Sequence, residues 1–325
     1  MILAGDVGGT HARLAFFDLE DGRLKLISAT IFPSREYSGL DQIVSEFLHT
    51  VNVQPDHVCF GIAGPVRDGR VETPNLPWMV DSHRLASELH LKSVLLINDL
   101  EANAWGIAEL ESKDQVVLNQ VKGNPQGNQA VIAAGTGLGE AGMYWDGTDH
   151  QVFASEGGHT DFAPRNEVEV ELFRYLNAQY GHVSYERILS GPGLVNVFHF
   201  LRDSGRGKEP QWLTDEMQHA DPAAAISQAA MDSRCSLCEQ AVEIFVSVYA
   251  AEAGNLALKV MATGGVYLGG GIAPKLLPKL SGSLFMHAFS AKGRMQSVLE
   301  AIPVKVITND KTALLGAARY AQMRS

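Results

Sequence analysis

Two short turns of glycine and threonine are the segments of this sequence best suited to hold phosphate groups. They are Gly8-Gly9-Thr10 and Gly135-Thr136-Gly137. A phosphate binds successive backbone N–H groups only where no side chain blocks its approach, and glycine removes that block. Either turn alone is more often an ordinary hairpin, but a third glycine run, Gly269-Gly270-Gly271, also follows a predicted strand. Together the three runs indicate a site for the phosphates of a nucleotide.

A second chemical feature is the pair Asn98-Asp99, which directly follows the apolar strand predicted at residues 94–97. A carboxylate at the carboxyl end of a strand is well placed to act as a general base. Aspartate is also a favoured N-cap, so Asp99 has an equally good structural role before a helix that begins at Leu100. The residues alone leave both roles open, and neither excludes the other.

The glycine runs do not match the common nucleotide-binding signatures. The chain contains neither Gly-x-x-x-x-Gly-Lys-Ser/Thr nor the His-Arg-Asp signature of protein kinases. The run that begins at Gly135 also departs from Gly-x-Gly-x-x-Gly, because Glu140 stands where the third glycine belongs. A P-loop and a dinucleotide-binding fold are therefore disfavoured.

Hydrophobic periodicity predicts the elements that position these residues. In the first part of the chain, one helix is expected at about 84–89, and another carries Leu40, Ile43 and Phe47 on a single face. The predicted strands of this part are residues 2–7, 11–17, 24–32, 58–62 and 94–97. A strand-rich start followed by alternating strands and helices is typical of a mixed sheet covered by helices.

The second part of the chain repeats that opening. A strand at 130–134 meets the second glycine turn, and a returning strand at 141–145 ends in Asp146-Gly147, as the first hairpin ends in Asp21-Gly22. Further elements are expected as helices at about 168–180, 193–201, 223–231, 237–261 and 313–323 and strands at 267–268 and 304–307. No Pro- or Gly-rich linker separates the parts, so a boundary near residue 110 is expected to be a hinge between packed lobes.

Composition narrows the class of protein. The 325 residues are 46% hydrophobic and 19% charged, which is typical of a compact α/β enzyme larger than one average domain. A formal net charge of -11 argues against nucleic acid or anionic membranes as partners. We expect neither a signal peptide nor an apolar run long enough to span a bilayer. Cys59 is expected to be buried, and Cys235 and Cys238 to bind no zinc, which favours a reduced, cytoplasmic protein.

Five longer motifs resemble, in order, those of bacterial glucokinases, which belong to the hexokinase, actin and Hsp70 superfamily. They lie at residues 6–13, 97–103, 156–164, 186–193 and 314–317. The resemblance extends over essentially the whole chain and implies an α/β, actin-like ATPase (ribonuclease H-like) fold with two lobes, each a mixed β-sheet flanked by helices. Residues 1–110, with a C-terminal helix at about 311–325, would form the small lobe and 111–310 the large one, with the active-site cleft between them.

The resemblance also implies roles for single residues. Asp99 is the expected catalytic base, and the expected sugar ligands are Asn75, Asn98, Asp99, Glu156, His159 and Glu186. The expected nucleotide contacts are Gly5, Asp6, Val7, Gly8, Gly9, Thr10, Arg13, Gly135, Thr136, Gly137, Gly269, Gly270 and Gly271. Arg13 either pairs with phosphate or is an exposed structural arginine, and Asp161 either binds sugar or orients His159 or the loop backbone. Pro74 replaces a threonine hydroxyl that relatives often have beside the asparagine.

The activity that the resemblance implies is ATP-dependent phosphorylation of glucose to glucose 6-phosphate, which feeds glycolysis. Glucose and ATP are the expected substrates, and Mg²⁺ is expected to be held mainly by the ATP phosphates, with Asp6 contributing through water. The lobes are expected to close on sugar binding, because water could otherwise attack the phosphate. The family resemblance also implies a homodimer.

Three other functions remain open at the level of the sequence. The first is a kinase of the same fold for fructose, mannose or an N-acetylhexosamine. The second is a sugar-sensing transcriptional regulator, which is disfavoured because the first phosphate motif starts at Gly5 and leaves no room for an N-terminal DNA-binding domain. The third is an actin- or Hsp70-like ATPase, which leaves Glu156, His159 and Glu186 without a role.

Overall fold

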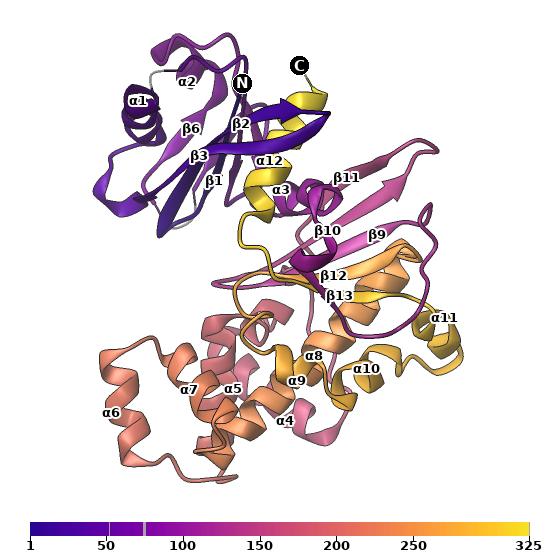
Figure 1. The fold of residues 1–325 in the computed structure, drawn as a ribbon. Helices are drawn as coiled ribbons and strands as arrows, with labels where there is room; N and C mark the ends of the chain where they lie inside the picture. Colours follow the sequence, from indigo (N-terminus) through magenta and orange to yellow (C-terminus); the bar gives the residue numbers. More distant parts are fainter. Residues whose placement is uncertain (52, 74–75, 325) are drawn as a thin grey trace. The chain divides into compact units, whose positions relative to one another are not determined.

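The computed structural model describes residues 1–51, 53–73 and 76–324, and its chain separates into two compact units (Figure 1). The first unit comprises Met1–Asp114, Val152–Ala154 and Asn309–Ser325, and the second comprises Gln115–Gln151 and Ser155–Thr308. The first unit therefore extends four residues beyond the boundary expected near residue 110, and it includes the C-terminal helix.

The first unit is built on a five-stranded sheet with the strand order β3-β2-β1-β4-β7. Its strands are β1 Ile2–Val7, β2 His11–Glu20, β3 Arg23–Pro33, β4 His57–Ile62 and β7 Leu95–Asn98. The first three strands are antiparallel neighbours, whereas β4 pairs in parallel with β1 on one side and with β7 on the other. A separate short hairpin consists of β5 Arg70–Glu72 and β6 Met79–Asp81.

Helices cover the first sheet, and a hydrophobic core lies on each of its faces. The helices of this unit are α1 Leu40–Val51, α2 Ser82–Glu88, α3 Asp99–Gly106 and α12 Thr312–Met323. Helix α1 turns Leu40, Ile43, Val44 and Phe47 inward, as its periodicity predicts, and Phe47 stacks on Phe16 of β2 at 5.4 Å between ring centroids. Burying one such side chain contributes about 1.5–3 kcal/mol. Helices α3 and α12 pack together against the sheet in the other core.

A six-stranded sheet with the order β11-β10-β9-β12-β13-β8 belongs to the second unit, except for Val152–Ala154 of β11, which are part of the first. The strands are β8 Gln115–Val117, β9 Gln129–Ala134, β10 Leu138–Trp145, β11 His150–Ser155, β12 Gly265–Gly269 and β13 Val304–Ile307. The helices are α4 Glu167–Tyr180, α5 Gly191–Asp203, α6 Gln211–His219, α7 Pro222–Met231, α8 Ser236–Val260, α9 Leu277–Leu280, α10 Ser283–Ser290 and α11 Gln296–Glu300. The long helix α8 packs on α5, α7 and α10 and on strand β9.

The internal repeat predicted from the sequence is confirmed by the strand pairing. In the first unit β1 forms an antiparallel hairpin with β2 and pairs in parallel with β4. In the second unit β9 likewise forms an antiparallel hairpin with β10 and pairs in parallel with β12. The glycine turns therefore join the two strands of each of these hairpins.

Helix α8 overturns one expectation from the sequence. It is long and apolar enough to cross a bilayer by length and composition, so the prediction that no run reaches that threshold is wrong. In the structure 72% of its most apolar window is buried within the protein, where it carries residues such as Phe245 and Tyr249. A helix that is buried on most of its sides in the core of a large protein is also long and apolar. Length and apolar composition alone are therefore weak evidence of a membrane span.

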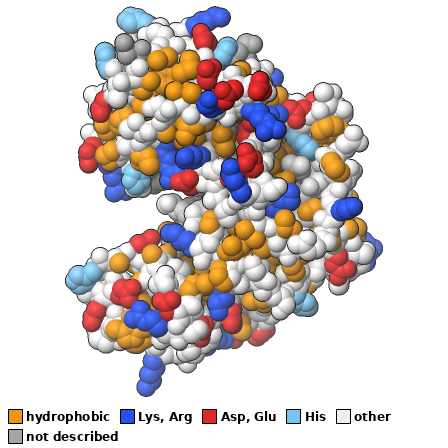
Figure 2. Space-filling view, viewed as in Figure 1, with side chains coloured by type: hydrophobic (Ala, Val, Ile, Leu, Met, Phe, Trp, Pro, Cys, Tyr) orange, Lys and Arg blue, Asp and Glu red, His pale blue; other side chains and the backbone are white. Residues whose placement is uncertain are grey.

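The surface carries both signs of charge. On the face shown in Figure 2, Lys and Arg side chains are interspersed with Asp and Glu, and apolar side chains lie between them. This mixture is in keeping with a charged-residue content of 19% and a net charge of -11.

Candidate active site

Asp99 lies at the junction between strand β7 and helix α3 in the first unit. Helix α3 begins at Asp99, and its N-cap is Asn98, whose Oδ1 accepts a hydrogen bond from the Leu100 N–H at 2.8 Å. Glu101 completes a capping box by accepting the Asn98 N–H at 3.1 Å. The alternative role predicted for Asp99, as the N-cap of this helix, is therefore wrong, because the N-cap is Asn98. Asp99 is the first helical residue and is partly buried.

Asn98 is held firmly by the protein itself. Besides capping α3, its side-chain amide donates to the Gly64 carbonyl oxygen at 3.0 Å. One amide N–H and one oxygen lone pair remain for a sugar hydroxyl, because an asparagine side chain has two donors and two acceptor positions. The predicted role of Asn98 as a sugar ligand thus competes with a structural role that the sequence did not indicate.

A close approach between α3 and the sheet brings Asp99 near Asp6 of strand β1. A side chain at Gly61 of β4 would lie 2.7 Å from Ala102 Cβ and 3.7 Å from Asp99 Cα, so only glycine lets the helix come this close. Burial and then the negative charge of Asp99 raise the pKa of Asp6 to about 6, with Arg13 opposing the shift and Asp310 adding to it. Asp6 and Asp99 therefore form one acidic group within the first unit.

The first glycine turn is fixed at one end and open at the other. Gly8 donates its N–H to the His11 carbonyl oxygen at 3.0 Å, and Ser34 Oγ donates to the Gly8 carbonyl oxygen at 2.8 Å. Within the described parts of the chain, the backbone N–H groups of Gly9 and Thr10 donate to no other residue. They are the donors of this turn that remain for an anion. Gly5 and Val7, which are also predicted to contact the nucleotide, are buried within β1.

Arg13 is held beside this acidic group by the C-terminal segment of the chain. Its guanidinium donates to the Asp310 carbonyl oxygen at 2.8 Å and lies 3.3 Å from the Asp310 carboxylate. The side chain of Arg13 is 33% exposed, so it is neither a free surface arginine nor fully buried. Asp310 is a site residue that sequence analysis missed, since 297 residues separate it from its partner.

The remaining predicted nucleotide residues meet in the second unit. Strands β9 and β12 are parallel neighbours with Gly269 opposite Ala133, so their two glycine runs leave the sheet side by side. Gly135 donates its N–H to the Gly137 carbonyl oxygen and accepts the Gly191 N–H at its own carbonyl oxygen. Thr136 is exposed, and its N–H donates to no other described residue. Gly270 and Gly271 are exposed beyond the end of β12.

Three of the predicted sugar ligands also lie together in the second unit. Glu186 Oε1 is 3.9 Å from His159 Nδ1, and His159 Nε2 is 4.0 Å from Glu156 Oε2. Glu186 Oε2 accepts the Leu138 N–H at 2.9 Å, one residue after the second glycine turn. The side chains of Glu156, His159 and Glu186 are 67%, 59% and 32% exposed, so all can reach a ligand. Two carboxylates and an imidazole that converge in this way can pair with several hydroxyl groups.

Two other residues predicted for the sugar site are not part of this group. Asn75 lies outside the described residues, as does Pro74. Asp161 does not orient His159, because its carboxylate instead lies 3.0 Å from His182 Nε2 and its side chain is 92% exposed. The predicted residues that the structure describes thus form two groups, one within each unit.

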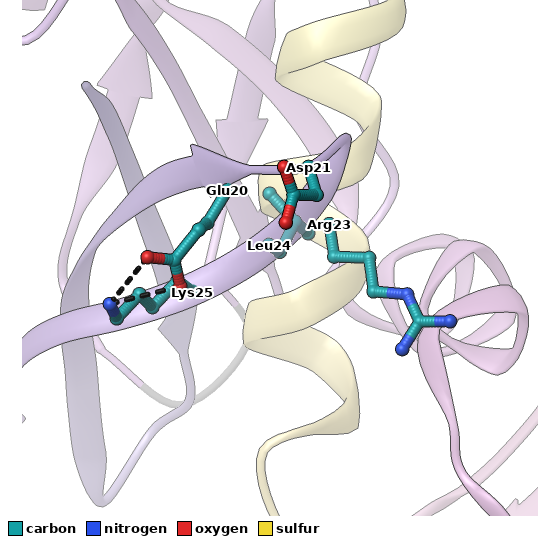
Figure 3. A pocket seen from close by; sticks show the side chains of 5 residues that line it. All are labelled: Glu20, Asp21, Arg23, Leu24 and Lys25. Atoms are coloured by element: carbon teal, nitrogen blue, oxygen red, sulfur yellow. Dashed lines mark hydrogen bonds and ion pairs between the residues drawn. The ribbon is translucent and has the colours of Figure 1, made fainter.

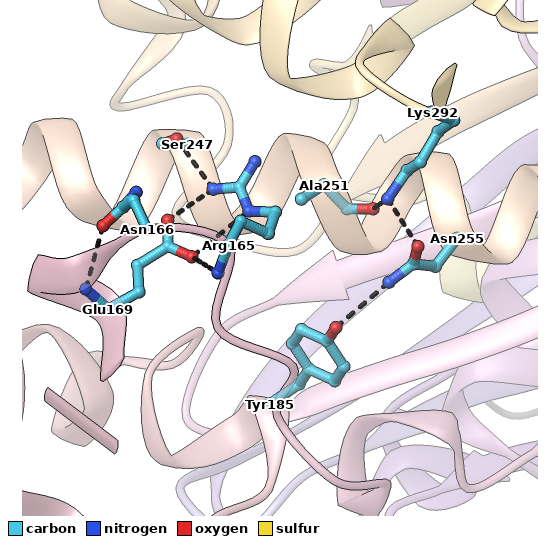
Figure 4. Close-up of polar contacts among 8 residues, drawn as sticks. All are labelled: Arg165, Asn166, Glu169, Tyr185, Ser247, Ala251, Asn255 and Lys292. Carbon is cyan, nitrogen blue, oxygen red and sulfur yellow. Dashed lines mark hydrogen bonds and ion pairs between the residues drawn. The ribbon is translucent and has the colours of Figure 1, made fainter. Parts of the chain in front are cut away.

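A partly buried chain of polar contacts that begins at Tyr185 was not anticipated from the sequence (Figure 4). Asn255 of helix α8 donates to the Tyr185 hydroxyl at 3.0 Å, and Lys292 donates to Asn255 Oδ1 and to the Ala251 carbonyl oxygen. Tyr185 directly precedes Glu186 in a short 3-10 helix, Tyr185–Arg187. This chain connects the predicted sugar ligand to the most buried helix of the unit. A spacing of 70 residues between Tyr185 and Asn255 left no local signal in the sequence.

A surface hollow at the tip of the β2–β3 hairpin lies apart from these residues (Figure 3). It is lined by Glu20, Asp21, Arg23, Leu24 and Lys25. The Glu20 carboxylate and the Lys25 ammonium already pair across it at 2.9 Å. Glu20, Asp21, Arg23 and Lys25 are exposed, whereas Leu24 is partly buried against the core of the first unit. We assign these residues no role.

The chain is similar to glucokinases over nearly its whole length. A family model described as Glucokinase matches residues 3–324. A glucokinase from Nostoc punctiforme is 41% identical over an alignment of 333 positions, which covers 98% of each chain. A solved glucokinase from an Antarctic psychrotroph is 31% identical, with a TM-score of 0.85 over 99% of this chain and 98% of the other. A ROK family glucokinase from Streptomyces griseus, solved in complex with glucose and AMPPNP, has a TM-score of 0.64 at 20% identity and 99% coverage of both chains. The predicted α/β, actin-like ATPase fold is confirmed.

Proposed function

The chain belongs to the glucokinase family, and on this basis we propose that it catalyses the ATP-dependent phosphorylation of glucose to glucose 6-phosphate. The observation that carries the proposal is the convergence of Glu156, His159 and Glu186 directly beside the second glycine turn. This arrangement gives one unit both a set of hydroxyl-binding side chains and open backbone donors for an anion.

ATP is the proposed phosphoryl donor. In the first unit the open N–H groups of Gly9 and Thr10 are suited to its phosphates, and Thr136 offers the same in the second unit. Gly269, Gly270 and Gly271 would lie along the adenosine. The Streptomyces griseus relative was solved with glucose and an ATP analogue, which supports ATP and glucose as the substrate pair.

Asp99 is the proposed general base. It would accept the proton of the sugar 6-hydroxyl as that oxygen attacks the γ-phosphorus in line with the β,γ-bridging oxygen, which leaves with ADP. Phosphoryl transfer needs mainly positioning and charge stabilisation, which the backbone donors and the Arg13 guanidinium would supply. The capped start of α3 keeps the Asp99 backbone rigid, and a rigid base is a precondition for accurate proton transfer.

Mg²⁺ is the proposed metal, held mainly by the phosphates of ATP. Asp6 suits a contact to Mg²⁺ through water, because its carboxylate offers oxygen atoms, the kind of ligand that this ion prefers. The neighbouring carboxylates of Asp99 and Asp310 add negative charge there. In the described parts of the chain, no group of three or more His, Cys, Asp or Glu side chains is arranged to hold a metal alone. When bound, the ion would offset phosphate charge that the Arg13 guanidinium by itself does not fully balance.

Asp6→Asn is expected to raise the Mg²⁺ concentration for half-maximal rate by roughly ten-fold, because losing a hydrogen-bonded outer carboxylate typically costs 10- to 100-fold in metal affinity or activity. Titration of Mg²⁺ at fixed ATP and glucose measures this effect. Asp18→Asn, at an exposed position on β2, should leave the titration unchanged. An unaltered Mg²⁺ requirement in the Asp6 variant would remove that residue from the proposed metal contact.

The proposed substrate is tested by assaying glucose, fructose, mannose and N-acetylglucosamine side by side with ATP. We expect the highest kcat/KM for glucose, because a site that pairs with each hydroxyl discriminates against sugars that misplace one. A clear preference for another of these sugars would replace glucose but keep the kinase chemistry. ATP hydrolysis that is independent of any sugar would instead favour an actin-like or Hsp70-like ATPase.

We further propose that the product enters glycolysis and that the protein acts in the cytoplasm as a homodimer. Its cysteines Cys59, Cys235 and Cys238 are all free thiols, as is typical of a reducing compartment. The dimer rests on family resemblance alone. Size-exclusion chromatography with light scattering at micromolar concentration measures the assembly directly, and a mass of about 35 kDa would exclude the dimer.

A further inference from the structure

A buried carboxyl group lies beneath the predicted sugar-binding turn, and the proposed chemistry gives it no role. Glu140 is on strand β10, two residues after Leu138, and its side chain is 1% exposed. Among the residues that the structure describes, its Oε1 has no hydrogen-bond partner. Burying a carboxylate without partners costs several kcal/mol, whereas a neutral carboxyl group costs far less. The site therefore favours the protonated form.

The charges around Glu140 also favour its protonated form. Helix α8 faces it with Glu252, which is fully buried, and with Tyr249 and Lys259. Burial and then the Glu252 charge raise the pKa of Glu140 to about 8, and Lys259 opposes the shift. Lys259 donates to Glu252 at 3.0 Å, as does Asn255 at 2.7 Å, so the Lys259 charge is mostly offset by Glu252. Glu252 is thus a carboxylate with hydrogen-bond partners, whereas Glu140 Oε1 has none among the described residues.

The Glu156–His159 turn rests directly on strand β10. Gly157 and Gly158 are buried, and a side chain at Gly157 would collide with the Glu140 carboxyl oxygen Oε2. A side chain at Gly158 would likewise collide with the Leu138 carbonyl oxygen. Gly157 itself donates to Ser155 Oγ at 3.0 Å. The position of Glu156 and His159 therefore depends on what lies at Glu140.

We propose that Glu140 is a positioning residue of the sugar site, whose neutral carboxyl group supports the Glu156–His159 turn and whose ionisation displaces it. This inference rests on the proposed function, because it assumes that Glu156 and His159 bind the sugar. An ionised Glu140 must gain water or move. Strand β10 and helix α8 are held by the sheet and the core, whereas the turn above Glu140 is short and its Glu156 and His159 side chains are exposed. The turn is the element that gives way.

The direction of the pH effect follows from the protonation state. Below about pH 8 Glu140 is neutral and the turn is supported, and above that pH the carboxylate accumulates and the turn is displaced. Glucose affinity should be constant on the acid side and weaken on the alkaline side, by up to about ten-fold for each pH unit. Glu140→Gln keeps the shape of the side chain but cannot ionise, so its affinity should not fall with rising pH.

The test is isothermal titration of glucose into the wild-type protein and the Glu140→Gln variant between pH 6.5 and 9.5. We expect the wild-type Kd to rise at least five-fold over the alkaline half of this range and the variant Kd to stay level. Glu243→Gln, an exposed position on the same helix α8, is the matched control and should follow the wild-type profile. Thermal melting of each variant verifies that it is folded at every pH used.

Hydrogen exchange of the peptide that contains residues 155–160 supplies a second measurement that does not depend on sugar. Its protection should decrease with pH in the wild type relative to Glu140→Gln at the same pH. Equal pH profiles of Kd and of exchange in the two proteins would overturn the role of Glu140 and leave the kinase function standing. Absence of glucose binding by the wild type at pH 7 would instead count against the proposed function, and the exchange comparison would still decide the role of Glu140.

Discussion

Asp99→Asn is expected to lower kcat by roughly 100- to 10,000-fold, the range that a positioned general base contributes. The amide cannot accept the proton of the sugar hydroxyl at neutral pH. It can still accept the Leu100 N–H, which Asp99 Oδ1 now accepts at 3.0 Å, so the start of helix α3 should survive. Glucose binding should therefore change by no more than a few-fold.

The measurement is a coupled assay of glucose 6-phosphate formation, together with titration calorimetry of glucose. An interaction made only in the transition state lowers kcat and kcat/KM by the same factor, and that pattern distinguishes a base from a binding residue. Asp18→Asn, at an exposed position of the same sheet, serves as the matched control. Near-normal turnover in the Asp99 variant would show that another group takes the proton.

Glu186→Ala is expected to raise the KM for glucose by about 100-fold and Glu186→Gln by about 10-fold, since hydrogen bonds to charged groups contribute about 1.5–3 kcal/mol. Alanine removes both the proposed sugar contact and the acceptor of the Leu138 N–H at 2.9 Å. Glutamine keeps a neutral acceptor for that N–H and loses only the charge. The rise in KM of Glu186→Gln therefore reports the loss of the charge at the sugar contact. The further rise in Glu186→Ala reports the loss of the side chain that accepts the Leu138 N–H at the start of strand β10.

Steady-state kinetics with glucose and ATP varied independently measure this effect. The KM for ATP should stay within a few-fold in Glu186→Gln, and Glu167→Gln, an exposed position at the start of helix α4, should change neither constant. An equal rise in both KM values would point to collapse of the second glycine turn rather than to loss of a sugar ligand. An unchanged glucose KM would remove Glu186 from the proposed site.

The sequence by itself determined many of the longer elements of the fold and the residue types of the proposed site. Runs of apolar residues located strands such as β1 and helices such as α8 to within three residues, because nearly all side chains of β1 and most of those of α8 are buried in a core. Helix α6, Gln211–His219, was not indicated, and Leu213 is its single fully buried side chain. The glycine turns were identifiable because their backbone function requires particular residue types in direct succession.

Tertiary structure alone decided which distant residues share an environment. Arg13 meets Asp310 across 297 positions, Tyr185 meets Asn255 across 70, and Glu140 is placed beneath Gly157 by a strand pairing and a packed helix. Asn98 rather than Asp99 became the N-cap, because the exact start of a helix depends on contacts outside it. Burial and neighbouring charge are properties of the packed chain, so the raised pKa values of Asp6 and Glu140 have no signature in residue order.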